Sequence, residues 1–463
     1  MRNGSYLEMS FLEKLQQQSV AVVGAGVTGV ATTKFLLSNG IKPVVFDESS
    51  KEIEGVATVA FPAQNIDLAI ISPGWNKSHP IIEALSRSGT ELISEIDFAW
   101  RIKQDIAPAQ KWIALTGTNG KTTSVQMVAS IFKSAGIHGT ACGNVGETVI
   151  ESLTRTDQYD FLAIELSSFQ IEWSHEARFE ACAILNIAED HIDWHGSFDQ
   201  YANSKIRLLS FSQIAILNAE DVEVVNRSTS WNGKKVFYSL QTPAVGELGL
   251  VEEILVDRAF VKDESRAEAL AELTDIKPTV PHNVSNALAA AGLARAIGID
   301  YLAIKAGLQT FVLDHHRIEV VMEKDGISWV NDSKATNPHS AIASILSHEK
   351  VLWIAGGLAK GANMDTLVKR VAPRLVGAIL IGRDRNVIAE ALKKFAPSVS
   401  ITIINDYDSP NELMDAVIRQ AIDTAQTGET VLLAPACASM DQFTSYSHRG
   451  DLFASSVHKL VGA

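Results

Sequence analysis

Twice in this sequence an apolar run ends in a glycine-rich turn and continues into a stretch with helical character. The first run, VAVV, leads into GAGVTG at residues 24–29, and the second, WIAL, leads into TGTNGKTT at residues 116–123. A strand, a tight turn and a helix in this order form the repeating unit of a parallel α/β sheet. Further short apolar runs, at residues 327–331, 351–357, 378–382 and 430–436, continue the alternation. The fold class we predict is therefore α/β.

The first glycine-rich turn matches the G-x-G-x-x-G pattern, and Asp47 stands at the end of the next apolar run. Taken alone, this pattern indicates dinucleotide binding. Its physical basis is general, because glycines let the backbone approach a pyrophosphate while the helix N-terminus offers N–H groups and partial positive charge. A UDP sugar would fit as well as NAD. We favour a UDP-type diphosphate over NAD, and the glycines could also be structural.

The second turn departs from a strict phosphate-loop pattern, because Leu115 stands where the first glycine is expected. The essential residues are present. Lys121 can reach terminal phosphates, Thr122 can bind Mg²⁺, and Gly117 and Gly120 leave room for backbone N–H groups to surround phosphate oxygens. This segment predicts ATP binding.

Acidic and histidine residues follow two later apolar runs. Glu165 ends the run FLAIE, where a charge would be costly unless it is paired or bound to a metal, and carboxylate oxygen suits Mg²⁺. The segment EDHIDWH, residues 189–195, follows the run AILNIA. By itself it could be a zinc site or a solvated turn. Because strand ends face the ligand crevice in open α/β sheets, we favour contact with substrate and Mg²⁺.

With 463 residues the chain exceeds what one hydrophobic core usually organises, and we predict three domains. The polar stretch 103–111 is the predicted first linker, and a second boundary is expected at 311–314. The prediction is a Rossmann-like domain at 1–106, a central domain of P-loop type with a mostly parallel sheet at 107–312, and a Rossmann-like domain at 313–463. The Glu-rich region 246–281 is expected to be less regular.

Composition excludes several classes. Hydrophobic residues make up 46% and charged residues 20%, which is typical of soluble globular proteins. No apolar run approaches the roughly 18 residues of a membrane span, and the segment 1–14 carries acidic residues where a secretory signal is apolar, so we expect a cytoplasmic protein. A net charge of −14 argues against nucleic acid. Three dispersed cysteines (Cys142, Cys182 and Cys437) are expected to be buried singly.

Four segments, in this order, carry a resemblance over essentially the whole chain: TGTNGKTT, CGNVG, ELSSFQ and EDHIDWH. They resemble the ATP-dependent Mur ligases of peptidoglycan synthesis. The segments NDSKATN (331–337) and PACASMDQF (435–443) are most similar to members that add D-glutamate, whereas members that add L-alanine or a diamino acid typically carry a DYAH-type segment there. The resemblance implies an ATP- and Mg²⁺-dependent enzyme, expected to be a monomer, that adds D-glutamate to UDP-N-acetylmuramoyl-L-alanine.

The resemblance also implies roles for individual residues. UDP would be held by Val27, Thr28, Asp47, Ser72 and Gly74. The nucleotide would be held by Gly117, Thr118, Asn119, Gly120, Lys121, Thr122, Thr123, Asn283, Asn286, Arg317 and Asp332. The catalytic positions would be Lys121, Glu165, His191 and Lys205, with Thr122, Glu165, His191 and Lys205 as metal ligands. Asn144 and Gln170 would lie near the reacting substrate, and Lys334, Thr336, Lys360, Ser439 and Tyr446 around D-glutamate.

Lys205 lies in the stretch YANSKIRLL, where a lysine is ordinarily a solvated surface charge. In the family the matching lysine is carbamylated, which would turn a cation into an anionic oxygen ligand for a second Mg²⁺. Two segments depart from the family. Related enzymes often have an aspartate close to the position of Lys360, and an apolar aromatic residue is also common at the position of Tyr446.

The chemistry implied by the resemblance is acyl phosphate formation followed by amide formation through a tetrahedral intermediate. The nearest alternative is a related ligase that uses another amino acid or adds glutamate to a folate. A NAD-dependent oxidoreductase would use the first turn. A non-catalytic nucleotide-binding regulator is disfavoured, because Lys121, Glu165, His191 and Asp332 are all present.

Overall fold

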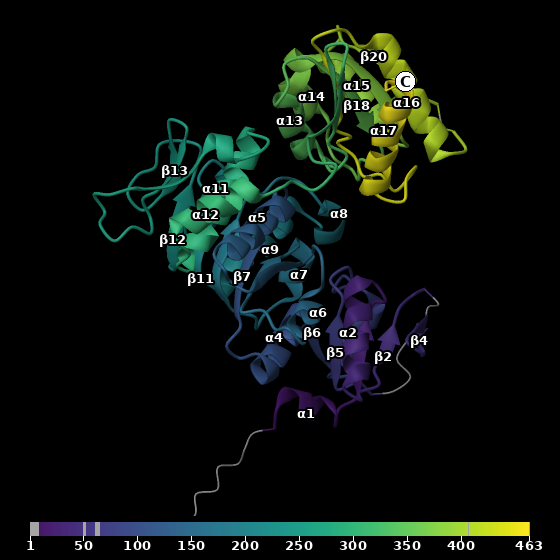
Figure 1. Cartoon of the computed structure of the whole chain (residues 1–463). Helices are drawn as coiled ribbons and strands as arrows, with labels where there is room; N and C mark the ends of the chain where they lie inside the picture. Colours follow the sequence, from purple (N-terminus) through teal and green to yellow (C-terminus); the bar gives the residue numbers. More distant parts are fainter. Residues whose placement is uncertain (1–8, 50–51, 61–64, 406, 463) are drawn as a thin grey trace, which may run out of the picture. The chain divides into compact units, whose positions relative to one another are not determined.

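A computed structural model describes residues 9–49, 52–60, 65–405 and 407–462 (Figure 1). Residues 1–8, which belong to the N-terminal segment considered above, lie outside these ranges. Within them the chain has a mixed α/β fold whose strands form three sheets, which confirms the predicted class. A search of the same ranges found no helix with the length and apolar character needed to cross a membrane.

The chain divides into two compact units. The first unit comprises residues 1–187, 199–276 and 283–311 and contains two of the sheets. The second unit comprises residues 188–198, 277–282 and 312–463 and contains the third sheet. The three predicted domain ranges stay predictions.

The first sheet is built around the apolar run that precedes the GAGVTG turn. Its strands lie in the order β3 (Glu52–Ile53), β4 (Val56–Val59), β2 (Val44–Phe46), β1 (Val20–Val23), β5 (Leu68–Ile71) and β6 (Glu91–Ser94). Neighbours are parallel except for the antiparallel pair β3 and β4. Every residue of β1 and β5 is buried, as expected for strands covered on both faces. The accompanying helices are α1 (Phe11–Leu15), α2 (Val27–Ser38), α3 (Pro80–Arg87) and α4 (Glu95–Ile106).

The second sheet contains the strand that leads into TGTNGKTT. Its order is β15 (Glu268–Glu272), β14 (Ile254–Asp257), β13 (Leu248–Val251), β12 (Lys234–Tyr238), β11 (Ser212–Asn218), β10 (Phe179–Ile184), β7 (Lys111–Thr116), β9 (Phe161–Glu165) and β8 (Gly139–Gly143). The seven neighbouring strands β13, β12, β11, β10, β7, β9 and β8 pair in parallel. The strands β13, β14 and β15 pair antiparallel. The region 246–281, expected to be less regular, therefore contains three strands that extend the sheet.

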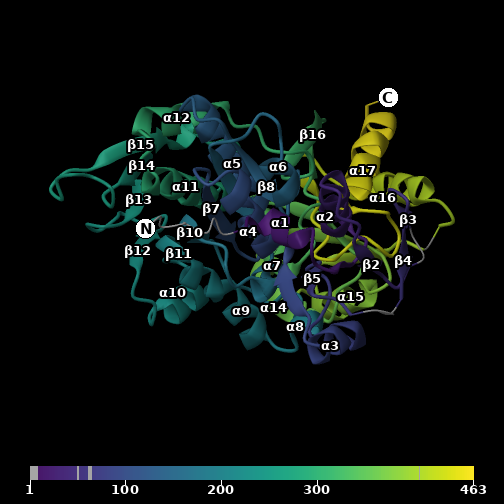
Figure 2. The same cartoon turned by 90° about the horizontal axis from the view of Figure 1, so that it is seen from below.

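Helices cover both faces of this sheet. One face packs against α5 (Lys121–Ser134), α11 (Pro281–Ala296) and α12 (Tyr301–Thr310), and their apolar residues form one core with those of the strands (Figure 1). Figure 2 shows α9 (Phe198–Ile206) and α10 (Val222–Ser228) on the other side of β11 and β12. The remaining short helices are α6 (Val149–Leu153), α7 (Ser168–Trp173), η1 (Arg207–Phe211) and η2 (Leu273–Asp275). Because the sheet is covered on both faces, ligands can reach the strands mainly at their ends.

The third sheet has the order β16 (Glu319–Lys324), β17 (Ile327–Asn331), β21 (Thr430–Leu433), β18 (Val351–Gly356), β19 (Leu375–Ile381) and β20 (Ser400–Ile403). Only β16 and β17 pair antiparallel. Two cores lie on its two faces. The first involves α13 (Pro338–Leu346), α14 (Asp365–Val371) and α15 (Arg385–Phe395), and the second α16 (Pro410–Thr424) and α17 (Tyr446–Leu460). The unit also contains α8 (Ile192–His195) and η3 (Ala372–Arg374).

The predicted linker 103–111 is wrong in its extent. Helix α4 continues to Ile106, and β7 begins at Lys111. Lys103 is 4% exposed, and its ammonium group donates to the carbonyl of Pro108 and lies over the ring of Trp100. The long stem of a lysine can be buried while its amine finds a polar partner, and composition alone does not reveal this. The predicted burial of the three cysteines is confirmed.

Candidate functional site

The phosphate loop of the first unit is shaped by Gly120. Its φ of +81° lies in the left-handed region, and it precedes α5 as an N-cap without a side-chain hydrogen bond. A Cβ atom at this position would lie 2.3 Å from Asn286 Oδ1, so only glycine fits. The first N–H groups of a helix have no partner within it, and together with the helix dipole they suit an anion. Asn286, predicted as a nucleotide contact, thus lies beside the loop.

Asn186, just after β10, fixes the conformation of this loop. Its side-chain Oδ1 accepts from the N–H of Asn119 at 2.8 Å, and its Nδ2 donates to the carbonyl of Asn119 at 3.1 Å. Its own carbonyl accepts from the N–H of Thr118. The sequence analysis missed this role. The sequence feature that could have indicated it is a polar residue directly after an apolar strand, at the carboxyl end of the parallel strands, where ligands bind.

Two lysines converge on one backbone carbonyl. Lys121 Nζ donates to the carbonyls of Gly117 and Thr118, at 2.8 and 2.9 Å. Lys205 Nζ donates to the same carbonyl of Gly117 at 2.9 Å. Two ammonium groups this close repel each other, and an anion placed among them would relieve the repulsion. The loop therefore concentrates positive charge where the sequence predicted terminal phosphates.

Lys205 is buried, with 2% of its surface exposed, and is not the solvated lysine that its helical stretch alone would suggest. Tyr201, one helical turn earlier on α9, places its ring 4.8 Å from Lys205 Nζ. The Tyr201 hydroxyl lies 2.8 Å from Thr118 Oγ1. Tyr201 thus connects the lysine to the phosphate loop. The sequence analysis missed it, although the spacing of four residues puts both side chains on one helix face.

Glu165 lies at the carboxyl end of β9, paired in register with Leu115 of the neighbouring β7. Its side chain is buried, and Oε1 accepts from Asn144 Nδ2 at 2.8 Å. Oε2 is also buried and has no hydrogen-bond partner among the described residues. An ionised carboxylate in such a place is costly unless a cation or donor completes it. This oxygen therefore fits the predicted role of Glu165 as a Mg²⁺ ligand.

The described ranges contain no group of three or more His, Cys, Asp or Glu side chains arranged to hold a metal ion. His191 precedes α8 with a φ of +52°, and its Nε2 lies 3.6 Å from Asp190 Oδ2. His191 belongs to the second unit, whereas Lys121, Glu165 and Lys205 belong to the first. The meeting of His191 with the phosphate loop stays a prediction.

The first glycine-rich turn lies at the carboxyl ends of β1, β2 and β5. Asp47 Oδ2 accepts from the N–H of Ala25 at 2.6 Å, and its other oxygen accepts from the N–H of Ser49. Ser72 Oγ donates to the carbonyl of Gly24. Val27, at the start of α2, is 77% exposed. Val27, Thr28, Asp47 and Ser72, four of the predicted UDP contacts, thus lie in or beside one turn, and the Asp47 carboxylate accepts a hydrogen bond from its backbone.

In the second unit, three loops and the first residue of α17, Tyr446, carry the positions predicted around D-glutamate. The loops follow β17, β18 and β21, and backbone hydrogen bonds tie them together between Ala335 and Ala436 and between Leu358 and Ala438. Lys334 Nζ lies 3.9 Å from the centre of the Tyr446 ring. Thr336, Lys360 and Ser439 lie on the same three loops.

Arg449 of α17 joins the loops that follow β17 and β21. It is fully buried, donates to the hydroxyl and the carbonyl of Ser333 at 3.0 Å, and donates to the carbonyl of Cys437 at 3.3 Å. Burial lowers its pKa to about 10. The sequence analysis missed Arg449, because a single arginine within a helix carries no local signal of burial.

Arg317 and Asp332, predicted as nucleotide contacts, also belong to the second unit. Burial raises the pKa of Asp332 to about 6, while the nearby charge of Arg317 opposes the rise. A carboxylate in this state can accept hydrogen bonds from hydroxyl groups near neutral pH.

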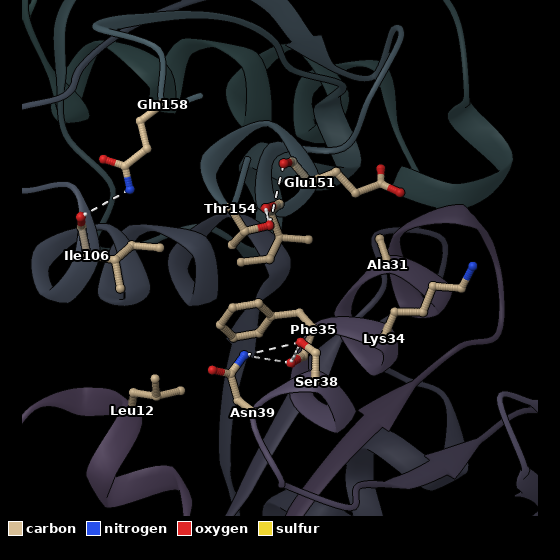
Figure 3. Close-up of a pocket in the computed structure, with 11 residues that line it drawn as sticks. Leu12, Ala31, Lys34, Phe35, Ser38, Asn39, Ile106, Glu151, Thr154 and Gln158 are labelled. Atoms are coloured by element: carbon tan, nitrogen blue, oxygen red, sulfur yellow. Dashed lines mark hydrogen bonds between the residues drawn. The ribbon is translucent and has the colours of Figure 1, made fainter. Parts of the chain in front are cut away.

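A separate hollow of about 480 Å³ in the first unit contains none of the predicted residues (Figure 3). It is lined by residues of α1, α2, α4 and α6 and of the following loop. Figure 3 shows Asn39 and Gln158 donating to neighbouring backbone carbonyls, those of Phe35 and Ile106. Its polar side chains thus serve the fold.

Comparison with known proteins identifies the class of protein that this fold and these loops define. Family models match in three places: the "Mur ligase MurD-like, N-terminal domain" at residues 18–94, the "Mur ligase middle domain" at 115–294, and the "Mur ligase, glutamate ligase domain" at 316–437. The chain belongs to the Mur ligase family.

Two relatives named UDP-N-acetylmuramoylalanine–D-glutamate ligase are each 42% identical to the chain. The one from Streptomyces coelicolor matches over 95% of this chain and 98% of its own length. The one from Thermobifida fusca matches over 97% of this chain and 100% of its own length. Solved structures share the fold at lower identity. Acinetobacter baumannii MurF has a TM-score of 0.61 with 15% identity, covering 96% of this chain and 98% of its own. Thermotoga maritima UDP-N-acetylmuramate–alanine ligase has a TM-score of 0.58 with 18% identity, covering 96% of this chain and 99% of its own.

Proposed function

We propose that this chain is an ATP-dependent ligase that joins D-glutamate to UDP-N-acetylmuramoyl-L-alanine, a step of peptidoglycan precursor synthesis. The names of relatives 42% identical over nearly the full length support this reaction. The structural observation that carries it is the convergence of the Lys121 and Lys205 side chains on the carbonyl of Gly117, which places both beside the phosphate loop. The positive charge of Lys121 at the start of α5 suits phosphoryl transfer, and Lys205 is placed where a carbamate would offer oxygens to Mg²⁺.

Each sheet has a proposed task. The sheet around β1 forms a Rossmann-like domain whose turn, with Val27, Thr28, Asp47, Ser72 and Gly74, holds the UDP diphosphate. The sheet around β7 forms the P-loop-type domain for ATP. The sheet of the second unit forms a Rossmann-like domain that supplies nucleotide contacts and binds D-glutamate.

Glu165 and Thr122 are proposed as Mg²⁺ ligands from the chemistry of their oxygens, and His191 and Lys205 from the family resemblance. Glu165 offers the buried Oε2, and Thr122 stands in the first turn of α5. His191 and Lys205, as a carbamate, complete the proposed set. When bound, Mg²⁺ neutralises charge on the phosphate oxygens.

Carbamylation of Lys205 is proposed on the family resemblance and supported by its surroundings. The lysine is buried, and the Lys121 ammonium group donates to the same Gly117 carbonyl, so conversion of Lys205 to a carbamate would remove a repulsion. It would also place two oxygens next to the phosphate loop, where a divalent cation can bind them.

The proposed reaction has two steps. The terminal carboxylate of UDP-N-acetylmuramoyl-L-alanine attacks the γ-phosphorus of ATP, and ADP leaves. Lys121 and the N–H groups at the start of α5 stabilise the charge on the transferring group. The amine of D-glutamate then attacks the acyl carbon, and phosphate leaves from the tetrahedral intermediate. Lys334, Thr336, Lys360, Ser439 and Tyr446 orient the D-glutamate.

We also propose that the enzyme is a monomer of the cytoplasm, without a nucleic-acid or membrane partner. The acidic net charge of −14 supports the part of this proposal that concerns nucleic acid. Light scattering of the purified protein during size-exclusion chromatography tests the monomer, since a dimer would double the mass.

One experiment tests the reaction and separates it from its alternatives. Phosphate release is measured with ATP, Mg²⁺ and UDP-N-acetylmuramoyl-L-alanine, with D-glutamate, L-glutamate, L-alanine or a diamino acid added in turn. Release with D-glutamate alone is expected. Release with another amino acid, or no release with any of them, would refute the proposal.

A further inference from the structure

Glu95 is a buried carboxyl group to which the proposed reaction gives no task. It is the first residue of α4, directly after β6, and it is 6% exposed. Its Oε1 accepts from Gln170 Nε2 at 3.0 Å. Its Oε2 is buried and has no hydrogen-bond partner among the described residues. A carboxyl group in this state is costly to keep, so its location needs an explanation.

The partner of Glu95 lies in the ELSSFQ segment. Gln170 is 2% exposed, and its Oε1 accepts from the N–H of Ser167 at 2.8 Å. Its backbone N–H donates back to Ser167 Oγ, which completes the cap at the start of α7. The same segment begins with Glu165, the proposed Mg²⁺ ligand. The Gln170 amide therefore connects Glu95 to the turn that follows β9.

Helix α4 does not need Glu95 in order to pack against α7. The carboxylate of Asp97 accepts from the backbone N–H groups of His175, Glu176 and Ala177, at 2.7 to 3.0 Å. Ser94 Oγ and Ser174 Oγ also lie 3.2 Å apart. These contacts are made with residues 174–177, which directly follow α7, whereas the Glu95 side chain is hydrogen-bonded to Gln170 within α7. The task of Glu95 is thus separable from the packing of the two helices.

The hydrogen bonds of the Gln170 amide fix its orientation. A glutamine amide has one acceptor oxygen and two N–H groups. The oxygen is engaged by Ser167 and one N–H by Glu95. We propose that Glu95 is a positioning residue for the ligase reaction, and that it directs the second N–H of Gln170 toward the reacting end of the UDP substrate. This inference rests on the place of Gln170 near that substrate under the proposed function.

Steady-state phosphate release by the full-length enzyme tests this role, with Glu95→Leu, Gln170→Leu and the double variant. Each single variant is expected to lower kcat/KM for UDP-N-acetylmuramoyl-L-alanine by about tenfold, the effect of one hydrogen bond to a charged group. The KM values for ATP and D-glutamate should stay within about twofold, because neither substrate is held by this pair. In the double variant the loss should be no larger than in Gln170→Leu.

Two further variants separate positioning from stability. Glu95→Gln keeps an acceptor oxygen for Gln170 and is expected to retain kcat/KM within about twofold. Asp97→Asn weakens the packing of α4 on α7, so it should lower the melting temperature while kcat/KM changes less than in Glu95→Leu. If Glu95→Leu does not fold, Glu95→Met removes the same acceptor with a more flexible side chain.

The outcomes test two claims separately: that Gln170 lies near the substrate, and that Glu95 positions Gln170. Wild-type kinetics in Gln170→Leu would overturn the place of Gln170 near the substrate, and the role of Glu95 with it. An impaired Gln170→Leu beside a normal Glu95→Leu would overturn the role of Glu95 alone. So would a double variant in which the two losses add in full.

Discussion

Each of the two glycine-rich loops of the first unit follows a parallel strand and precedes a helix, but their glycines serve different purposes. In the first loop, a Cβ on Gly29 would lie 1.8 Å from the carbonyl oxygen of Gly24, and one on Gly24 would meet the side chains of Ser72 and Trp75. In the second loop, Gly120 makes room for Asn286, and the Gly117 carbonyl receives two lysines. The first loop is closed by its own packing, whereas two lysine side chains, Lys121 and Lys205, contact the second.

This difference matches the proposed chemistry. A diphosphate that is only bound needs a rigid turn and a helix N-terminus, and in the first loop a carboxylate, Asp47, completes the turn. A phosphoryl group in transfer changes its charge distribution, so groups aimed at that charge lower the barrier. Variants of the first loop should therefore change binding and stability, whereas variants of the second should change turnover.

Replacement of Lys121 tests this contrast most strongly. Lys121→Ala is expected to lower kcat on the order of 10²-fold or more, as removal of other preorganised charge-stabilising groups does. In the first loop, Thr28→Ala is the matched control and should raise KM for the UDP substrate with little change in kcat. Both are measured by phosphate release. Near-normal turnover of Lys121→Ala would refute its assignment.

Lys205 tests whether the second loop depends on an added oxygen ligand. Lys205→Ala is expected to abolish most of the activity, because the carbamate is lost, and a small added carboxylate should restore part of it. Activity is measured with and without the carboxylate. Lys121→Ala, which lacks a charge and not an oxygen ligand, should show no such rescue. Full activity of Lys205→Ala without rescue would contradict the proposal.

Gly29 tests the packing of the first loop. Gly29→Ala places a methyl group against the carbonyl of Gly24, and we expect it to lower the free energy of unfolding by about 3 kcal/mol or more, the upper range for overpacking. Gly26 is the control in the same turn, since a Cβ there meets no atom within 4 Å. Denaturation in urea measures both variants. Equal stability of the two would show that the turn adjusts.

The sequence predicted the strands that lead into both loops, the loops themselves and the carboxylate that ends β9. These features follow from local patterns of apolar residues and glycines. Asn186 and Tyr201 escaped the sequence analysis because their partners, Asn119 and Thr118, lie 67 and 83 residues away. Such contacts depend on which strands become neighbours, and local periodicity does not encode that.

Lys205 and the region 246–281 show a second reason. A lysine in a helical stretch is usually solvated, and only the neighbouring β7 loop and the ring of Tyr201 make this one a buried residue. The strands β13 and β14 are four residues each and partly exposed, so their apolar pattern was too short to indicate strands. In both cases tertiary packing outweighed the local propensity.

Glu95 lies between the two loops in the sequence, and the smallest effect we predict is its contribution to the pH dependence of stability. Burial raises the pKa of Glu95 from its ordinary value of 4.5 to about 7, while its hydrogen bond from Gln170 opposes the rise. Between these two values the folded chain binds more protons than the unfolded chain, so stability falls as pH rises. From about pH 5.5 to about pH 7.5 this residue should cost about 2 kcal/mol of unfolding free energy.

Urea denaturation of the wild type and Glu95→Gln at both pH values measures this cost. Because glutamine does not titrate, the variant should be more stable relative to the wild type at the higher pH, by about the same 2 kcal/mol. If the free energies of unfolding of the two proteins differed by the same amount at both pH values, the Glu95 carboxyl group would keep one charge state over this range. The predicted titration of Glu95 would then be wrong.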